Sequence, residues 1–193
     1  MKHLAWLAAA VAALTLGGCY ESNGLLLDAS AARQPISQYQ DWKYGGDTKY
    51  HARLNPRSDG WYDYEEAKIA ADGSEGTWEH HTVLLNYLEN ANGLDLYVYA
   101  TWEDSEKAYV YGVVAVRSDG WWQSVRPDCD SMSGDPKWVG ADANAATQAG
   151  GTLKSDDAGD SCQFTNSASL FQAMRNVVAE PGFWDRVQAA ANG

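Results

Sequence analysis

Basic side chains are scarce in this sequence. The chain has 14 Lys and Arg against 26 Asp and Glu, which gives a formal net charge of −12. A surface of this charge repels phosphate groups, so the composition argues against nucleic-acid binding. Proline is also scarce, with 5 residues in 193, and only 21% of the residues are charged, whereas 45% are hydrophobic. These proportions exclude a disordered or collagen-like chain and indicate one domain with a sizeable core.

Long apolar runs are absent as well. The longest run covers residues 4–18, whereas a membrane-spanning helix needs about 20 apolar residues. Lys2 and His3 precede the run, and two glycines and Cys19 follow it. A basic start, a short apolar segment and small residues before a cleavage point are typical of an export signal. We therefore interpret residues 1–18 as a signal peptide.

The end of this segment, Leu16-Gly17-Gly18-Cys19, resembles the lipobox of bacterial lipoproteins. The resemblance implies cleavage before Cys19, a diacylglycerol thioether on its thiol and a further acyl chain, such as palmitate, on its amine. Such a lipid anchor holds a protein at a membrane permanently. Tyr20 stands where Asp tends to mark inner-membrane retention, so the resemblance implies an outer-membrane lipoprotein facing the periplasm of a Gram-negative cell. The alternative is a signal that merely precedes a disulfide cysteine.

Cysteine is rare, with 3 residues in the chain. If Cys19 carries lipid, Cys129 and Cys162 remain as a pair. In an oxidising compartment the default state of such a pair is a disulfide, and two buried free thiols are the alternative. No Cys-X-X-Cys pair is present to indicate a metal site.

Beyond the signal, we expect a lipid-anchored tether over residues 19–35 and one globular domain over residues 36–193. Residues 94–102 and 108–116 alternate between two kinds of side chain, which predicts two antiparallel strands. Towards the C-terminus the apolar period becomes helical, with one apolar stripe over residues 170–178. The predicted fold is therefore α+β: an antiparallel β-meander sheet with C-terminal helices packed on one face, and one disulfide.

One pentapeptide, Arg-Ser-Asp-Gly-Trp, occurs twice, at residues 57–61 and 117–121. Its Asp-Gly pair is a tight-turn signal, and Asn92-Gly93 is another. The residues around the two copies align poorly. We therefore favour the same turn chemistry used twice over an internal duplication.

Aromatic residues are the best binding candidates, because flat rings stack on sugars. If Trp102 pairs with Ala108, four tyrosines of the two predicted strands share one face, and tryptophans near the turns extend it. Burial of this face under the C-terminal helices is the favoured alternative, which leaves the tryptophans as an exposed patch. The candidates are Trp61, Trp121, Trp122, Tyr97, Tyr99, Tyr109 and Tyr111.

Acidic residues surround both predicted disulfide cysteines in residues 127–161, a loop-like region that could include a short helix. Asp128, Asp130 and Asp135 are weak candidates for a calcium site, and a solvated acidic loop is the favoured interpretation. His80 and His81 point to opposite faces if they lie on a strand, so they cannot share an ion. No HExxH, GxSxG or phosphate-binding glycine motif is present, and no cofactor is expected.

These observations predict a lipid-anchored envelope protein with a non-enzymatic binding role. Its partner is expected to be either a basic periplasmic protein, in which case this protein acts as an inhibitor or immunity protein, or an envelope glycan. The alternatives are an envelope hydrolase with a dispersed carboxylate site and a purely structural envelope component.

Overall fold

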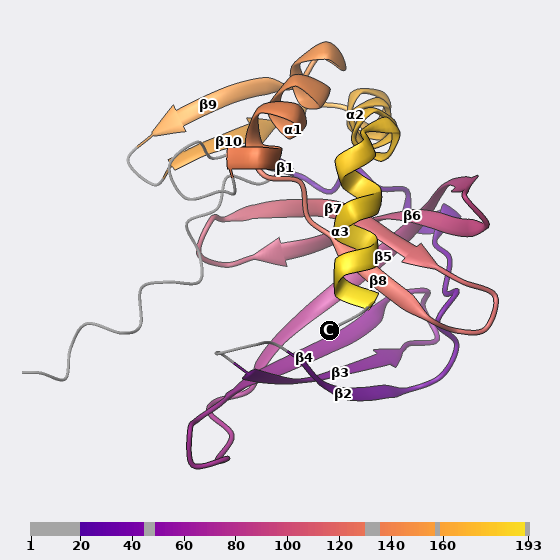
Figure 1. Cartoon of the computed structure of the whole chain (residues 1–193), viewed down its shortest axis with the longest axis vertical. Coiled ribbons are helices and arrows are strands. Elements are labelled where there is room, and N and C mark those ends of the chain that lie inside the picture. Colours follow the sequence, from indigo (N-terminus) through magenta and orange to yellow (C-terminus); the bar gives the residue numbers. More distant parts are fainter. Residues whose placement is uncertain (1–19, 45–48, 130–135, 157–158, 192–193) are drawn as a thin grey trace, which may run out of the picture.

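The computed structural model describes residues 20–44, 49–129, 136–156 and 159–191. Figure 1 shows its strands and helices, and the α-helices lie in the C-terminal part of the chain. The strands are β1 (Tyr20–Ser22), β2 (Gln40–Tyr44), β3 (Lys49–Pro56), β4 (Tyr62–Ile69), β5 (Glu79–Ala91), β6 (Leu94–Glu103), β7 (Ala108–Val116), β8 (Trp122–Val125), β9 (Thr152–Asp156) and β10 (Gly159–Gln163). The helices are the 3₁₀ turn η1 (Ala29–Ala31), α1 (Pro136–Gln148), α2 (Ser167–Ala179) and α3 (Pro181–Ala191). No helix of the described residues is long and apolar enough to cross a membrane.

The strands form one ten-stranded sheet, in the order β2-β3-β4-β5-β6-β7-β1-β10-β9, with β8 also paired to β7. Strands β2 to β8 follow one another as an antiparallel meander, and the parallel pair is β1 with β10. The turn between β5 and β6 is the predicted one, with Asn92 and Gly93 both at positive φ. The predicted α+β fold, with its meander and helices, is confirmed.

The meander curls so that one side of it becomes an interior. Trp42 of β2 and Trp122 of β8 lie at opposite ends of the meander, and their rings meet edge to face at 5.1 Å. Tyr62 is fully buried inside the curl and accepts a hydrogen bond from the backbone N–H of Ile36. Burial raises the pKa of Tyr62 to about 12. Side chains from β3, β5, β6 and β7 also belong to this cluster: Leu54, Leu85, Tyr97, Val114 and Val116.

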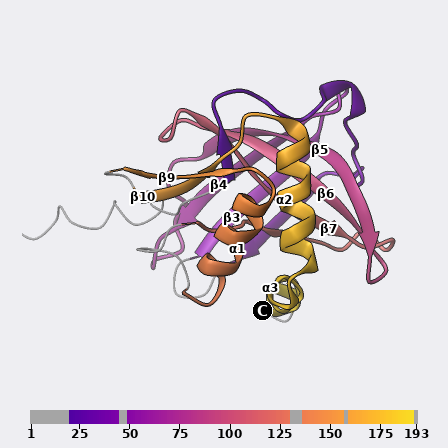
Figure 2. The same cartoon turned by 90° about the horizontal axis from the view of Figure 1, so that it is seen from above.

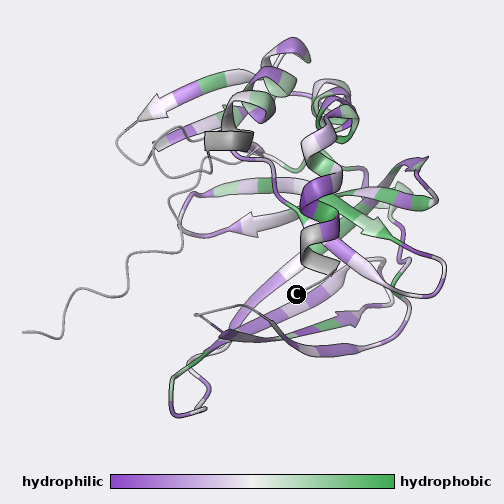
Figure 3. Cartoon of the chain, in the orientation of Figure 1, coloured by the Kyte–Doolittle hydropathy of each residue, from purple (hydrophilic) through white to green (hydrophobic). Residues whose placement is uncertain are grey.

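The helices cover the other side of the sheet at β5, β6 and β7. Leu84, Val98 and Val113 face them from these three strands and belong to the same buried cluster as the helices. The apolar stripe predicted for α2 is confirmed, and its buried residues are Leu170, Ala173, Met174, Val177 and Val178. Figures 2 and 3 show α1 beside α2, with hydrophobic residues gathered on α2, α3 and the strands beneath them.

The predicted disulfide is confirmed. Cys129, in the segment after β8, is bonded to Cys162 on β10, with the two Cα atoms 5.9 Å apart. The bond closes a loop with a sequence separation of 33 residues. In the loop-entropy model a loop of this size is worth about 3–4 kcal/mol.

Residues 20–35 differ from the tether that the sequence predicts. Tyr20 is fully buried in β1, between Tyr111 of β7 and Cys162 of β10. Its hydroxyl donates to the backbone oxygen of Asp142 in α1, and burial raises the pKa of Tyr20. Leu27 is also buried in the core. The segment therefore belongs to the folded domain, because β1 joins β7 to β10 and the residues after it pack on the core and on β5.

Strands β6 and β7 pair one residue away from the expected register. Glu103, rather than Trp102, lies opposite Ala108, so Tyr99 faces Gly112 instead of Tyr111. A shift of one residue moves a side chain to the opposite face of a sheet. The prediction of one tyrosine face is therefore wrong: two of the tyrosines lie on each side of the sheet.

Candidate functional site

The aromatic candidates do not form one surface. Tyr97 is buried inside the curl, where Tyr99 and Trp122 pack beside it. Tyr111 is fully buried on the helix side, where Tyr109 packs against the same cluster. The predicted burial under the C-terminal helices does not hold for Tyr97 and Tyr99, because the curl of the sheet covers them. Tyr111 belongs to the same buried cluster as the helices, and its hydroxyl is hydrogen-bonded to Ser22 and to the backbone N–H of Leu26.

The two Arg-Ser-Asp-Gly-Trp copies form the same turn in two hairpins. In each copy the arginine N–H donates to the tryptophan oxygen at 2.8 Å, and the aspartate accepts from the tryptophan N–H. The glycines have φ angles of 89° and 91°. Trp61 and Trp121 both pack partly on the helix-side cluster. The repeated turn chemistry explains both tryptophans structurally.

A polar pocket of about 620 Å³ opens on the part of the outer sheet face that the helices leave uncovered. Alternate residues of three adjacent strands line it: Arg53 and Asn55 of β3, Asp63 and Glu65 of β4, and His80 and Thr82 of β5. Trp102 of β6 stands at the end of this row, with Tyr39 and Asp104 beside it. Tyr64 and His81 also border the pocket, although they alternate with the outward-facing residues of β4 and β5. The volume lies within the range of small-molecule sites in proteins.

Strand pairing explains why these side chains meet. Thr82 and Leu84 are two residues apart on β5, and Trp102 and Ala100 are two apart on β6, so each pair points to one face. The register places Glu65 opposite both Arg53 and His80. The pocket therefore continues the same outer face on which the helices lie, but with polar residues in place of apolar ones.

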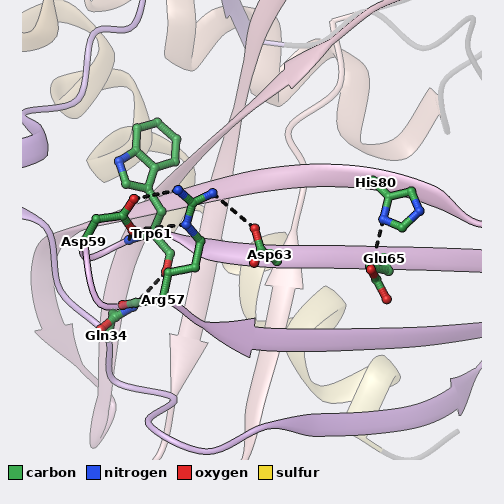
Figure 4. A network of polar contacts seen from close by, with 7 residues as sticks. All are labelled: Gln34, Arg57, Asp59, Trp61, Asp63, Glu65 and His80. Carbon is green, nitrogen blue, oxygen red and sulfur yellow. Dashed lines mark hydrogen bonds and ion pairs between the residues drawn. The ribbon is translucent and has the colours of Figure 1, made fainter.

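The charged side chains of the pocket hold one another in place. The Glu65 carboxylate lies 2.9 Å from Nδ1 of His80 and 3.9 Å from Nη1 of Arg53. Asp63 lies 3.2 Å from Nη1 of Arg57, which also pairs with Asp59 of the turn. Figure 4 shows Asp63 paired with Arg57 and Glu65 paired with His80. The pocket thus presents a fixed set of hydrogen-bonding groups rather than isolated charges.

Two aromatic side chains flank this polar floor. Trp102 is half-buried, its ring packs edge to face on Tyr109 at 5.2 Å, and its Nε1–H donates to Asp104 at 3.0 Å. This hydrogen bond is the first cause of the lowered pKa of Asp104. Tyr39 is 54% exposed, and its hydroxyl donates to Asp41. A ligand in the pocket can therefore meet both aromatic rings and polar groups.

The two adjacent histidines and the calcium candidates do not come together. His80 is exposed and pairs with Glu65, whereas His81 lies on the opposite side near Tyr64, as expected for neighbours on a strand. Asp128 uses its backbone N–H to bond Asp142. Two calcium candidates, Asp130 and Asp135, lie outside the described residues. Within the described ranges no group of three or more His, Cys, Asp or Glu could hold a metal ion.

Sequence reasoning missed the pocket, although part of its signal was present. Charged and polar residues recur at every second position of 51–55 and 63–65, which is the period of a strand with one polar face. The pairing of β4 between β3 and β5 brings these positions together, and no local motif reports that pairing.

No family model, curated protein or solved structure matches the chain. The chemistry of the described residues is therefore the basis for a functional argument.

Proposed function

We propose that this protein is a lipid-anchored component of the cell envelope that binds a neutral envelope saccharide in the β3–β6 pocket, without catalysis. The anchor is Cys19, and the saccharide is held by the polar floor and by Trp102. The observation that carries the binding role is the pocket itself, which combines an aromatic ring with a fixed network of carboxylate, guanidinium and imidazole groups.

Saccharides suit this arrangement because their rings have apolar faces and polar rims. A half-buried indole offers a flat apolar surface for the face, while Asn55, Asp63, Glu65 and His80 offer donors and acceptors for hydroxyl or acetamido groups. The pocket's acidic side chains outnumber its arginine, which disfavours an anionic sugar.

The ion pairs favour a saccharide over a basic protein partner. Glu65 and Asp63 already have basic partners within the domain, so an incoming lysine would have to displace them.

Two observations support export and anchoring. The signal layout ends in a lipobox-like sequence, and the domain contains a disulfide, which is typical of oxidising compartments. Tyr20, the residue after Cys19, is buried in the sheet. A lipid on Cys19 would therefore hold the domain directly at the membrane surface, within reach of glycan close to the bilayer.

Binding is tested with the full protein, purified in detergent from membranes. A trimer of N-acetylglucosamine serves as the neutral probe, and a sialic-acid-containing trisaccharide serves as the anionic control. We expect saturable binding of the neutral probe by calorimetry. Absence of binding across a panel of neutral envelope sugars, or release of reducing ends from the probe, would overturn the proposed binding role.

Anchoring has its own test. The Cys19→Ala variant is expected to leave the membrane fraction, while the wild-type protein remains in it and incorporates labelled palmitate. Continued membrane retention of Cys19→Ala would contradict the lipoprotein assignment.

A further inference from the structure

His51 of β3 lies beside the pocket and is held by two carboxylates. His51 is only 8% exposed, and both nitrogens of its ring have acidic partners. Nε2 lies 2.7 Å from Oδ1 of Asp41 on β2, and Nδ1 lies 2.6 Å from Oε1 of Glu75 in the β4–β5 loop. A neutral imidazole has one N–H donor and can donate to only one of these carboxylates, whereas an imidazolium can donate to both.

The same loop reaches the pocket through Trp78. The Trp78 ring packs against the His51 ring at 5.0 Å, and the Arg53 guanidinium lies over Trp78 at 4.0 Å from the ring centroid. Arg53 in turn contributes to the pocket wall. The imidazole, the indole and the guanidinium thus form one continuous row of contacts from the loop to the pocket.

A second connection passes through Asp41. One of its carboxylate oxygens accepts from His51, and the other accepts from Tyr39 at 3.0 Å and lies 3.4 Å from Nε of Arg53. Tyr39 and Arg53 both line the pocket. His51 therefore contacts the groups that hold two pocket residues in position.

The charges around His51 favour its protonated form. Asp41 and Lys43 face it from β2, Arg53 flanks it on β3, and Glu75 faces it from the loop. On β4 its direct partner is uncharged Ala67, with Glu65 diagonally beyond. The hydrogen bonds to Asp41 and then to Glu75 raise the pKa of His51, against a smaller opposing effect of desolvation.

We propose that His51 is a proton-dependent latch: protonated, it holds the 70–78 loop against β2 and β3 and so positions Arg53 and Tyr39 for the ligand. The ligand part of this proposal rests on the proposed saccharide site, whereas the latch itself is a property of the domain. Loss of the proton removes one of the two carboxylate contacts, and the loop and Trp78 are then released from the pocket side.

The direction of the pH effect follows from the raised pKa. The latch contributes fully below the ordinary histidine pKa near 6.5 and is lost as the pH rises through the higher folded-state value. We therefore expect the loop to be ordered at mildly acidic pH and opened at alkaline pH.

Hydrogen exchange of the full protein tests the latch without any ligand. The reporting amides are Ala70 and Gly76, which donate to Ser74 and Lys68 within this loop region. After correction for intrinsic exchange, their protection is expected to fall by about tenfold or more between about pH 6 and pH 9. Equal protection at the two pH values would overturn the proposal.

Two variants identify the titrating group. His51→Gln can still donate to one carboxylate, and its loop protection is expected to be independent of pH. Glu75→Gln removes the charge of a partly exposed partner and is expected to move the wild-type transition to lower pH. The control is Asp72→Asn, which alters the same loop but bonds Ser74 rather than His51. A wild-type pH response in His51→Gln would refute the latch.

Affinity for the N-acetylglucosamine trimer separates the latch from the proposed function. With both correct, affinity falls at alkaline pH in the wild type and stays constant in His51→Gln. A loop that responds to pH in a protein that binds no neutral saccharide supports the latch and refutes the saccharide site. Saccharide binding by a protein whose loop protection does not change with pH supports the saccharide site and refutes the latch. A responding loop with constant affinity would overturn the positioning of Arg53 and Tyr39.

Discussion

The outer face of the sheet has two halves with opposite chemistry. Over β5 to β7 it carries Leu84, Val98 and Val113, and the helices bury it. Over β3 to β5 it carries Arg53, Glu65 and other polar residues, and it forms the pocket. Figure 3 shows the mostly hydrophilic colouring of β3 and β4 against the hydrophobic residues beneath the helices.

The boundary between the halves runs within single strands. On β5, Thr82 lines the pocket, and two residues later Leu84 lies under the helices. On β6, Trp102 lines the pocket and Ala100 is buried in the helix-side core. One face of one sheet thus provides stability at one end and a binding surface at the other. Substitutions in the two halves should affect different measurements.

The largest effect on stability is expected in the helix layer. Asp142 of α1 is fully buried, and Arg186 of α3 contacts both of its oxygens at 2.8 and 3.0 Å. Arg186→Met leaves a buried carboxylate without its cation, which costs about 3–5 kcal/mol of unfolding free energy in urea. Arg175→Met is the control, because the exposed Arg175–Glu89 pair is worth under about 1 kcal/mol. Equal losses for the two variants would contradict the structural role of the Asp142–Arg186 pair.

Removal of the disulfide is the next largest expected effect. The double variant Cys129→Ser, Cys162→Ala should lose about 3–4 kcal/mol of unfolding free energy in chemical unfolding, because its unfolded chain is no longer cross-linked across a sequence separation of 33 residues. Saccharide affinity of the folded variant should stay unchanged, since the bond lies in the covered half. A loss of saccharide affinity with unchanged stability would contradict the assignment of the disulfide to the helix-covered, stabilising half of the sheet.

A smaller effect is expected from the open half. Trp102→Ala should weaken binding of the N-acetylglucosamine trimer by about 5- to 30-fold, which corresponds to loss of one aromatic stacking surface. Trp184→Ala is the matched control, because Trp184 packs on the helix-side cluster. Calorimetry should show reduced affinity in the first variant, and urea unfolding should show reduced stability mainly in the second. Equal affinities would exclude Trp102 from the site.

The smallest expected effects on stability come from substitutions of the glycine in each copy of the repeated turn, and they should differ between the two copies. Both glycines have positive φ, so alanine costs about 1–2 kcal/mol at either position. At Gly60 the new Cβ would also meet Cβ of Ala32 at 3.1 Å, whereas nothing lies within 4 Å at Gly120. Thermal unfolding should therefore show a greater loss for Gly60→Ala than for Gly120→Ala. The reverse order would contradict the docking of residues 20–35 on the first hairpin.

Local signals account for the parts of the fold that the sequence predicts. Asn92-Gly93 sets a hairpin, and Asn166 caps α2, where its side chain accepts from the Ser169 N–H. The apolar stripe of α2 and the pairing of the two cysteines can also be predicted from the sequence. Each of these features depends on residues close in sequence, or on a count of cysteines.

The parts that the sequence does not predict depend on long-range pairing. Nearly every residue of β7 is buried, so neither of its faces differs enough to set the register against β6. The short strands β9 and β10 depend on β1, which joins them to β7 from the other end of the chain. The pocket depends on β4 lying between β3 and β5. The two-residue period of each strand places its polar residues on one face, but the pairing of the three strands brings them together as one site.

The indole resonances of Trp102 and Trp184 test the division of the sheet most directly. In a two-dimensional NMR titration of the labelled full protein with the N-acetylglucosamine trimer, the Trp102 indole signal is expected to shift saturably while the Trp184 signal stays in place. A titration that shifts Trp184 and leaves Trp102 unchanged would place the ligand on the helix-covered side and contradict the account.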